Sequence, residues 1–151
     1  MFYRYRFKAD IYPDLSRIPL HVRMKLDLTG LKISLKDWLG FSLEERRVLC
    51  HLPVDTDEEK QNFSSYLDFL SRRYFGADVA KISPAANPPW ENLDGVPESV
   101  EAKSRETGQA ITVEEWKRWN ACQRYALFKL SASRNEPAAF PETLREFREE
   151  N

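Results

Sequence analysis

The sequence predicts a mainly α protein, a single-domain helical bundle with one N-terminal β-strand. Three helix-start signals of the form Ser/Thr-x-x-Glu, each followed by apolar residues at helical spacing, carry this prediction. The chain has 151 residues, of which 42% are hydrophobic and 13% aromatic, and this is enough material for one domain. A chain of this length buries roughly 68–70% of its unfolded surface, so its core needs no metal or disulfide.

The N-terminal residues alternate between aromatic or apolar side chains and charged ones. This period of two predicts a half-buried strand at residues 3–9, and its best internal partner is the short apolar alternation at residues 31–35. A helix is predicted between them, at residues 19–29. Pro19 suits its first turn, and Gly30 suits the position after its last turn.

The capping signals place the larger helices. The pairs are Ser42 with Glu45, Thr56 with Glu59, and Thr112 with Glu115. In each pair the hydroxyl accepts from a free backbone N–H and the carboxylate accepts from another. They predict helices at residues 43–52, 57–75 and 113–133, of which the last is the longest and the most apolar. A short final helix follows Pro141.

Residues 77–111 are predicted to form a Pro-rich surface loop on the single domain 1–151. Six Pro or Gly residues interrupt this segment, which has room for one short helix near residues 97–107 with Gly108 as its stop. Trp90 is the one aromatic side chain in it. We expect Trp90 to pin the loop to the core rather than to contact a partner.

Charge and composition limit the classes of partner that this protein can have. The net charge of −1 lacks the basic field of a nucleic-acid-binding protein. No apolar run approaches the ~20 residues that span a bilayer, and the N-terminus lacks the apolar core of an export signal. Two isolated cysteines suit a reducing compartment. We therefore expect a cytoplasmic protein with no nucleic-acid partner and no membrane partner.

The sequence lacks the motifs of common catalytic sites. His21 and His51 are the only histidines, and neither has another ligand at metal-binding spacing. There is no Gly-rich phosphate loop and no Gly-x-Ser-x-Gly nucleophile motif. We expect no catalytic residues, no metal and no cofactor, and therefore a protein that is not an enzyme.

Two polar groups on otherwise apolar helices are the candidate partner-binding residues. They are Arg23, Lys25 and Asp27 on the first helix, and Gln123, Arg124 and Lys129 on the predicted long helix. Three interpretations stay open. The residues are an ordinary surface pair with rim residues, or a polar patch that contacts a partner, or they include a buried Arg124–Asp27 pair that joins the two helices.

Basic residues concentrate near the N-terminus. Residues 1–37 hold eight Lys or Arg against four Asp, whereas residues 42–110 hold eight basic and thirteen acidic residues. This distribution indicates either ordinary solvated faces or a basic docking surface for an acidic protein.

An ordered set of segments along nearly the whole chain carries a family resemblance. The segments are Phe7-Lys8-Ala9-Asp10, the run from Ile18 to Asp27, Gly30, Trp38, Phe41-Ser42-Leu43-Glu44-Glu45-Arg46, Pro53, Trp116, the run from Gln123 to Leu130, Phe140, Leu144 and Glu146-Phe147. With this set the chain resembles the nitrate reductase-associated proteins, a family found mostly in cyanobacteria.

The resemblance implies an accessory role in nitrate assimilation. Members are typically encoded near the genes for nitrate reductase and for molybdopterin synthesis, which implies a maturation or assembly factor that binds a molybdenum-cofactor nitrate reductase or its maturation machinery. The alternatives are a protein-interaction module with another client and a small molybdopterin carrier.

The chain departs from the family pattern at three positions where members often carry Cys. These positions hold Arg17, Thr29 and Val54. Thiol chemistry at those positions is therefore not available to this chain, which favours a binding role or a different client.

Overall fold

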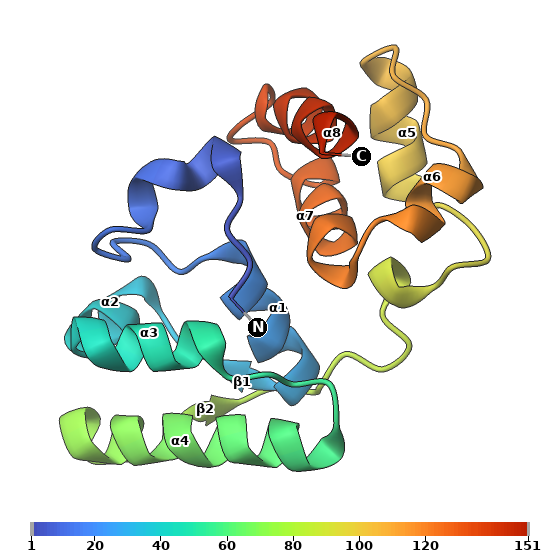
Figure 1. The fold of residues 1–151 in the computed structure, drawn as a ribbon. Helices are drawn as coiled ribbons and strands as arrows, with labels where there is room; N and C mark the ends of the chain where they lie inside the picture. The colour runs from blue at the N-terminus through green and yellow to red at the C-terminus, as the bar shows by residue number, and fades with distance from the viewer. Residues whose placement is uncertain (1, 151) are drawn as a thin grey trace. The chain divides into compact units, whose positions relative to one another are not determined.

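The computed structural model describes residues 2–150 and is mainly α, as the sequence predicts (Figure 1). Among these residues the only sheet is a short one of two strands. The chain divides into two compact units, Met1–Ala86 and Asn87–Asn151. The expected single domain at residues 1–151 stays a prediction.

The first unit consists of helices and the small sheet. Its elements are the 3₁₀ helix η1 (Arg6–Ile11), α1 (Leu20–Thr29), β1 (Leu31–Lys32), α2 (Leu35–Gly40), α3 (Leu43–His51), α4 (Asp57–Phe75) and β2 (Ala80–Lys81). The core side chains of this unit include Val22, Trp38, Leu49, Phe63, Leu67 and Leu70, all fully buried. Helices α3 and α4 run side by side (Figure 1), and the Tyr74 hydroxyl donates to the Glu45 carboxylate at 2.6 Å.

The N-terminal strand predicted at residues 3–9 is wrong, because this segment leads into the 3₁₀ helix η1. Its aromatic rings pack against one another, with the Tyr5 ring centroid 4.7 Å from that of Tyr3 and 5.7 Å from that of Phe7. Its backbone forms a hydrogen bond within the segment, in which the N–H of Lys8 donates to the carbonyl of Tyr5 at 3.2 Å. An alternating pattern makes a strand only where a neighbouring strand pairs with it, and here the backbone groups are satisfied by turns.

Of the strand predicted at residues 31–35, only Leu31 and Lys32 are in a strand, β1, and this strand pairs with β2 rather than with the N-terminal segment. The pairing is antiparallel, with Leu31 opposite Lys81. It continues into the turn after α1, where the N–H of Ile82 donates to the carbonyl of Gly30 at 2.9 Å. A Cβ at Gly30 would lie 2.6 Å from the Ile82 carbonyl oxygen, and φ here is +72°. Only glycine suits this position, both for the left-handed backbone and for the close approach of β2.

Helix α1 is confirmed and α2 was not predicted. The first begins after Pro19 and ends at Gly30, as the sequence indicates. The second begins at Ser34, whose side chain accepts from the N–H of Asp37 while the Asp37 carboxylate accepts from the N–H of Ser34. This capping box has Asp in place of the Glu or Gln that defines the usual signal, and this is why the apolar alternation at residues 31–35 dominated the prediction.

Helices α3 and α4 are confirmed together with their capping boxes. The Ser42 hydroxyl accepts from the N–H of Glu45, the Thr56 hydroxyl accepts from the N–H of Glu59, and both carboxylates return the bond. Helix α4 has the predicted bounds and ends at Gly76, whereas α3 ends one residue before the predicted end.

The second unit consists of helices only, among the residues described. They are the 3₁₀ helix η2 (Pro89–Glu91), α5 (Glu98–Glu106), α6 (Val113–Arg118), α7 (Ala121–Ser131) and α8 (Ala139–Glu149). Fully buried side chains in this unit include Val100, Trp116, Tyr125, Leu127, Phe140, Leu144 and Phe147. The predicted final helix is confirmed as α8.

The single long helix predicted at residues 113–133 is wrong, because the chain breaks it into α6 and α7. Trp119 is extended, with ψ at 151°, and Asn120 begins α7 as its N-cap. The Asn120 side chain accepts from the N–H of Gln123, and the Gln123 side chain accepts from the N–H of Asn120. Apolar periodicity continues across the break, so only the Asn-x-x-Gln capping box marks it.

The segment at residues 77–111, predicted as a loop with one short helix, also contains β2 and the 3₁₀ helix η2. Helix α5 occupies most of the predicted helix at residues 97–107. Trp90 is 3% exposed, and its ring centroid lies 4.8 Å from that of Tyr125 and 5.5 Å from that of Phe128. Trp90 therefore pins η2 to α7, as expected.

Candidate functional site

The three candidate residues on α1 differ in their environment. Arg23 is exposed, Asp27 is half-buried, and Lys25 is 3% exposed. Arg23 and Asp27 are four residues apart and lie on the same side of α1. Lys25 lies among the apolar residues that α1 turns toward α3.

The Lys25 ammonium caps the C-terminus of α3. Its Nζ donates to the carbonyl of Leu49 at 3.1 Å and to that of Cys50 at 2.7 Å. The last carbonyls of a helix have no partner within the helix, and the helix dipole makes this end partly negative. A cation is therefore stabilised there, which explains how a lysine is accommodated in the core.

His21 shares this acceptor with Lys25. Its Nε2 lies 3.1 Å from the Cys50 carbonyl, and its Nδ1 is buried with no hydrogen-bond partner among the described residues. A carbonyl accepts only, so the proton of the neutral ring is on Nε2. Burial, assisted by the positive charge of Lys25, lowers the pKa of His21 to about 3. The ring is therefore neutral at physiological pH.

The N-terminal residues cover His21. The Phe2 ring stacks on the imidazole, with centroids 5.1 Å apart and planes at 19°. The Arg4 guanidinium in turn lies 3.9 Å from the centroid of the Phe2 ring. Burial also raises the pKa of the Cys50 thiol to about 12, so this thiol stays protonated and unreactive.

The family-like segment at residues 41–46 fastens the N-terminal residues to α3. The Arg46 guanidinium donates to the carbonyls of Asp14 at 2.9 Å and Leu15 at 3.1 Å. The Trp38 indole donates to the same Leu15 carbonyl at 2.8 Å. Leu15 is fully buried with φ at +49°, an uncommon conformation for leucine, so these two donors hold a backbone position of higher energy.

On α7, two of the three candidate residues have partners inside the second unit. The Gln123 side chain takes part in the capping box of α7, and its Nε2 donates to Glu150 at 3.1 Å. The Arg124 Nε donates to the carbonyl of Trp90 at 2.6 Å, and its Nη1 donates to the carbonyl of Trp119. Arg124 is 9% exposed, and this burial lowers its pKa. The guanidinium thus ties η2 and the turn between α6 and α7 to one helix.

Lys129 is the exposed member of the α7 set. Its Nζ lies 5.6 Å from the centroid of the Tyr125 ring, which suits a weak cation–π contact.

The structure therefore places the six candidate residues in two sets of three, one in each unit. Lys25, Gln123 and Arg124 are buried and bonded inside their own units, whereas Arg23 and Lys129 face solvent. Asp27 belongs to the first unit and Arg124 to the second, so the pair between them stays a prediction.

Sequence reasoning missed the part that His21 plays beside Lys25. The signal was present, because His21 and Lys25 are four residues apart in a helix whose other inward positions are apolar. Two polar groups at that spacing indicate a buried acceptor on a neighbouring element. The sequence does not say which element supplies it.

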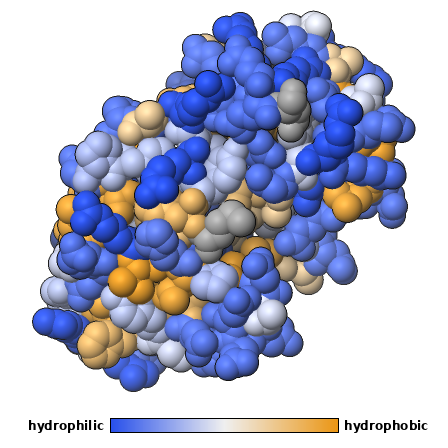
Figure 2. All heavy atoms as spheres, viewed as in Figure 1, coloured by the Kyte–Doolittle hydropathy of each residue, from blue (hydrophilic) through white to orange (hydrophobic). Residues whose placement is uncertain are grey.

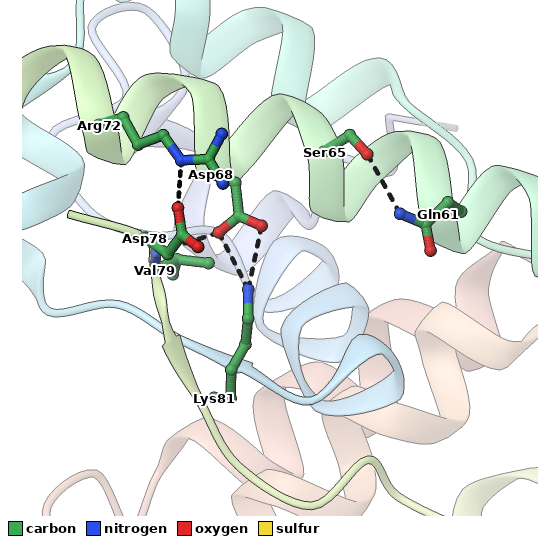
Figure 3. A network of polar contacts seen from close by, with 7 residues as sticks. All are labelled: Gln61, Ser65, Asp68, Arg72, Asp78, Val79 and Lys81. Carbon is green, nitrogen blue, oxygen red and sulfur yellow. Dashed lines mark hydrogen bonds and ion pairs between the residues drawn. The ribbon is translucent and has the colours of Figure 1, made fainter.

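Two open hollows lie in the first unit. One, of about 420 Å³, is formed by the N-terminal segment around Tyr5 and Tyr12. The other, of about 150 Å³, lies between α2 and the end of α4 and contains Asp37 and Asp78. Asp37 caps α2, and Asp78 forms an ion pair with Arg72, so both carboxylates are already engaged (Figure 3).

Within residues 2–150, no three His, Cys, Asp or Glu side chains are grouped as a metal site would require. None of the helices in this range is long and apolar enough to cross a membrane.

Comparison with known proteins identifies the family. Neither the curated proteins nor the solved structures include a match to this chain. A family model does match, over residues 4–147, and so it covers nearly the whole sequence and both compact units. On this match the chain belongs to the family of conserved nitrate reductase-associated proteins.

Proposed function

We propose that this protein is a non-catalytic accessory protein of nitrate assimilation, which acts in the cytoplasm by binding a protein client. The client is a molybdenum-cofactor nitrate reductase or a component of its maturation machinery. The observation that carries the proposal is the family match over residues 4–147. The association with nitrate reductase in the family description thus applies to the entire fold rather than to a short motif.

The state of the reactive side chains supports binding rather than catalysis. His21 has a pKa of about 3 and is enclosed by Phe2, and the pKa of Cys50 is raised to about 12. General acid–base catalysis works best with a pKa near the operating pH and needs access to the substrate. Nucleophilic catalysis by cysteine needs a thiolate. Neither side chain meets these requirements.

The exposed candidates suit a role in client contact. Arg23 and Lys129 face solvent, one in each unit, and Asp27 is half-buried beside Arg23. Arginine holds a carboxylate with two parallel hydrogen bonds, which gives direction as well as attraction. We assign client contact to these three residues. Lys25, Gln123 and Arg124 support it by fixing the helices that present them.

Co-purification from nitrate-grown cells tests the proposal. A tagged protein should retain nitrate reductase or a molybdenum-cofactor protein, identified by mass spectrometry. Arg23→Glu and Lys129→Glu should reduce the retained client while leaving the melting temperature unchanged. Arg17→Glu and Lys117→Glu serve as matched controls, because both are exposed in the same two units. A different client, retained equally by all variants, would contradict both the function and the surface.

A further inference from the structure

Five residues of α4 form an exposed stripe along the helix. They are Glu58, Asn62, Ser65, Phe69 and Arg73, and we call them the α4 stripe. Their spacings of four, three, four and four residues place them on one side of a helix of 3.6 residues per turn. The core residues of α4 lie on the other side, and all five stripe residues are exposed.

The stripe has an aromatic centre. Phe69 is 54% exposed, the highest value among the large hydrophobic side chains that the structure leaves at the surface of residues 2–150. It stacks on the half-buried Tyr66, with ring centroids 6.4 Å apart and planes at 27°. Figure 2 shows further hydrophobic residues at the surface of the first unit, in the region of α3 and α4. An exposed apolar surface with a polar rim is typical of a protein contact site.

The two ends of the stripe carry opposite charges. Glu58 lies in the first turn of α4 next to Asp57, and Arg73 lies in the last turn next to Arg72. Fifteen residues separate Glu58 from Arg73, about 22 Å at 1.5 Å per residue. Each charge is favourable for its own helix end. Because the ends have opposite charges, two copies of the stripe are complementary when they lie antiparallel, with the acidic end of each against the basic end of the other.

The register of that pairing follows from the spacing. When two copies of α4 lie antiparallel with Glu58 of each opposite Arg73 of the other, Asn62 faces Phe69 and Ser65 faces Tyr66. The short side chains of Asn62 and Ser65 leave room for the aromatic rings opposite. A two-fold axis repeats every contact, as a closed symmetric dimer requires.

The polar network beside the stripe uses one of its charged residues, because the exposed Arg73 guanidinium lies 4.0 Å from the Glu45 carboxylate. Asp68 accepts from the N–H of Val79 at 3.1 Å and from the Lys81 ammonium at 2.9 Å, and Arg72 pairs with Asp78 (Figure 3). The bonds made by Asp68 and Arg72 fix β2 to α4, and neither residue belongs to the stripe. The Gln61 amide contacts the Ser65 hydroxyl at 3.2 Å in an exposed bond that water can replace.

We propose that the α4 stripe binds a second copy of this chain, forming a two-fold antiparallel homodimer. A client helix would need to supply an apolar centre, a basic end and an acidic end, in the right order. A second copy supplies all three by its own symmetry. The proposal concerns self-association and does not depend on the function proposed above.

Molecular mass as a function of concentration tests the proposal. Light scattering or sedimentation should show a monomer–dimer equilibrium for the full chain. Phe69→Ser should weaken the dimer by roughly tenfold or more, as truncation of a central aromatic side chain does. Leu39→Ser is the matched control, because Leu39 is 47% exposed and lies outside the stripe. It should leave the equilibrium unchanged. Circular dichroism and melting temperature confirm that both variants are folded.

Charge reversal tests the antiparallel pairing. Glu58→Arg and Arg73→Glu should each weaken the dimer, because each places like charges at both ends of the interface. The double variant should restore it, because it exchanges the charges and leaves the two ends complementary. Lys36→Glu, an exposed reversal on α2, should have no effect. Failure of the double variant to recover the dimer would overturn this pairing.

A cross-link tests the register. Ser65→Cys should form an intermolecular disulfide on oxidation, because the two copies of this position lie next to the two-fold axis and a disulfide requires Cα atoms roughly 4.4–6.8 Å apart. Ser83→Cys, exposed and outside the stripe, should not. A wild-type chain that is monomeric up to millimolar concentration would overturn the proposal. So would loss of a client, without any change in mass, in Phe69→Ser.

Discussion

At the scale of single residues, two buried cations perform the same task. Lys25 binds the carbonyls of Leu49 and Cys50 at the end of α3, and Arg124 binds those of Trp90 and Trp119. In both places the backbone oxygens have no partner in a helix. A long cationic side chain supplies the missing donors, and it does so from a neighbouring helix.

Removing Arg124 should therefore destabilise the protein. We expect Arg124→Ala to lower the free energy of unfolding by roughly 1–3 kcal/mol, because the two carbonyls lose their donor inside the core. Lys129→Ala, at the exposed end of the same helix, should change it by less than about 0.5 kcal/mol. Chemical denaturation measures both. A loss of roughly 3–5 kcal/mol would instead favour the predicted ion pair with Asp27. Equal stability of the two variants would contradict the assignment.

His21 should make stability depend on pH. The pKa of His21 is about 3 in the folded protein and 6.5 in an exposed histidine, so between these pH values the unfolded chain binds a proton that the folded chain does not. The contribution of neutral His21 to the free energy of unfolding is fully present above pH 6.5 and is lost progressively as the pH falls toward 3. The free energy of unfolding then changes with pH by at most about 1.4 kcal/mol per pH unit.

Denaturation between pH 7 and 5 checks this dependence, because most carboxylates stay ionised in that range. His21→Gln should flatten the dependence. The same slope in wild type and His21→Gln would show that another group is responsible.

The six candidate residues were predictable as a polar set, but their environments were not. The sequence places Lys25 and Arg124 on apolar helices, where a cation either extends its head to water or finds an internal acceptor. The acceptors are backbone carbonyls of α3 and η2, and no side-chain pattern identifies a carbonyl. Arg23 and Lys129 are exposed.

At the scale of elements, the sequence predicts helices where two local signals agree. Helix α4 has the predicted bounds because Thr56 and Glu59 mark its start and Gly76 its end. The strand at residues 3–9 fails because alternation is only half of a strand, and the other half is a partner elsewhere in the chain. The break at Asn120 was missed because apolar spacing continues across it.

The break between α6 and α7 should respond to its cap. Asn120→Ala removes the oxygen that accepts from the N–H of Gln123, and we expect a loss of about 1 kcal/mol. Asn120→Asp keeps an acceptor at the same place and should retain most of the stability. Thermal unfolding of the three proteins checks this. An Asn120→Ala variant as stable as wild type would mean that α7 does not begin at this residue.

At the scale of the whole molecule, the family match extends over both compact units. The match begins in the N-terminal segment and ends in α8, so the family is defined by both units together. The buried residues of the candidate set stabilise each unit separately. The exposed ones are distributed over both.

Nitrate-dependent growth tests most directly whether the protein assists nitrate reductase. A strain lacking the gene is grown with nitrate or with ammonium as the sole nitrogen source, with and without the wild-type gene restored. We predict loss of growth and of nitrate reductase activity on nitrate, normal growth on ammonium, and recovery on complementation. Equal growth and equal nitrate reductase activity on nitrate with and without the gene would contradict the account.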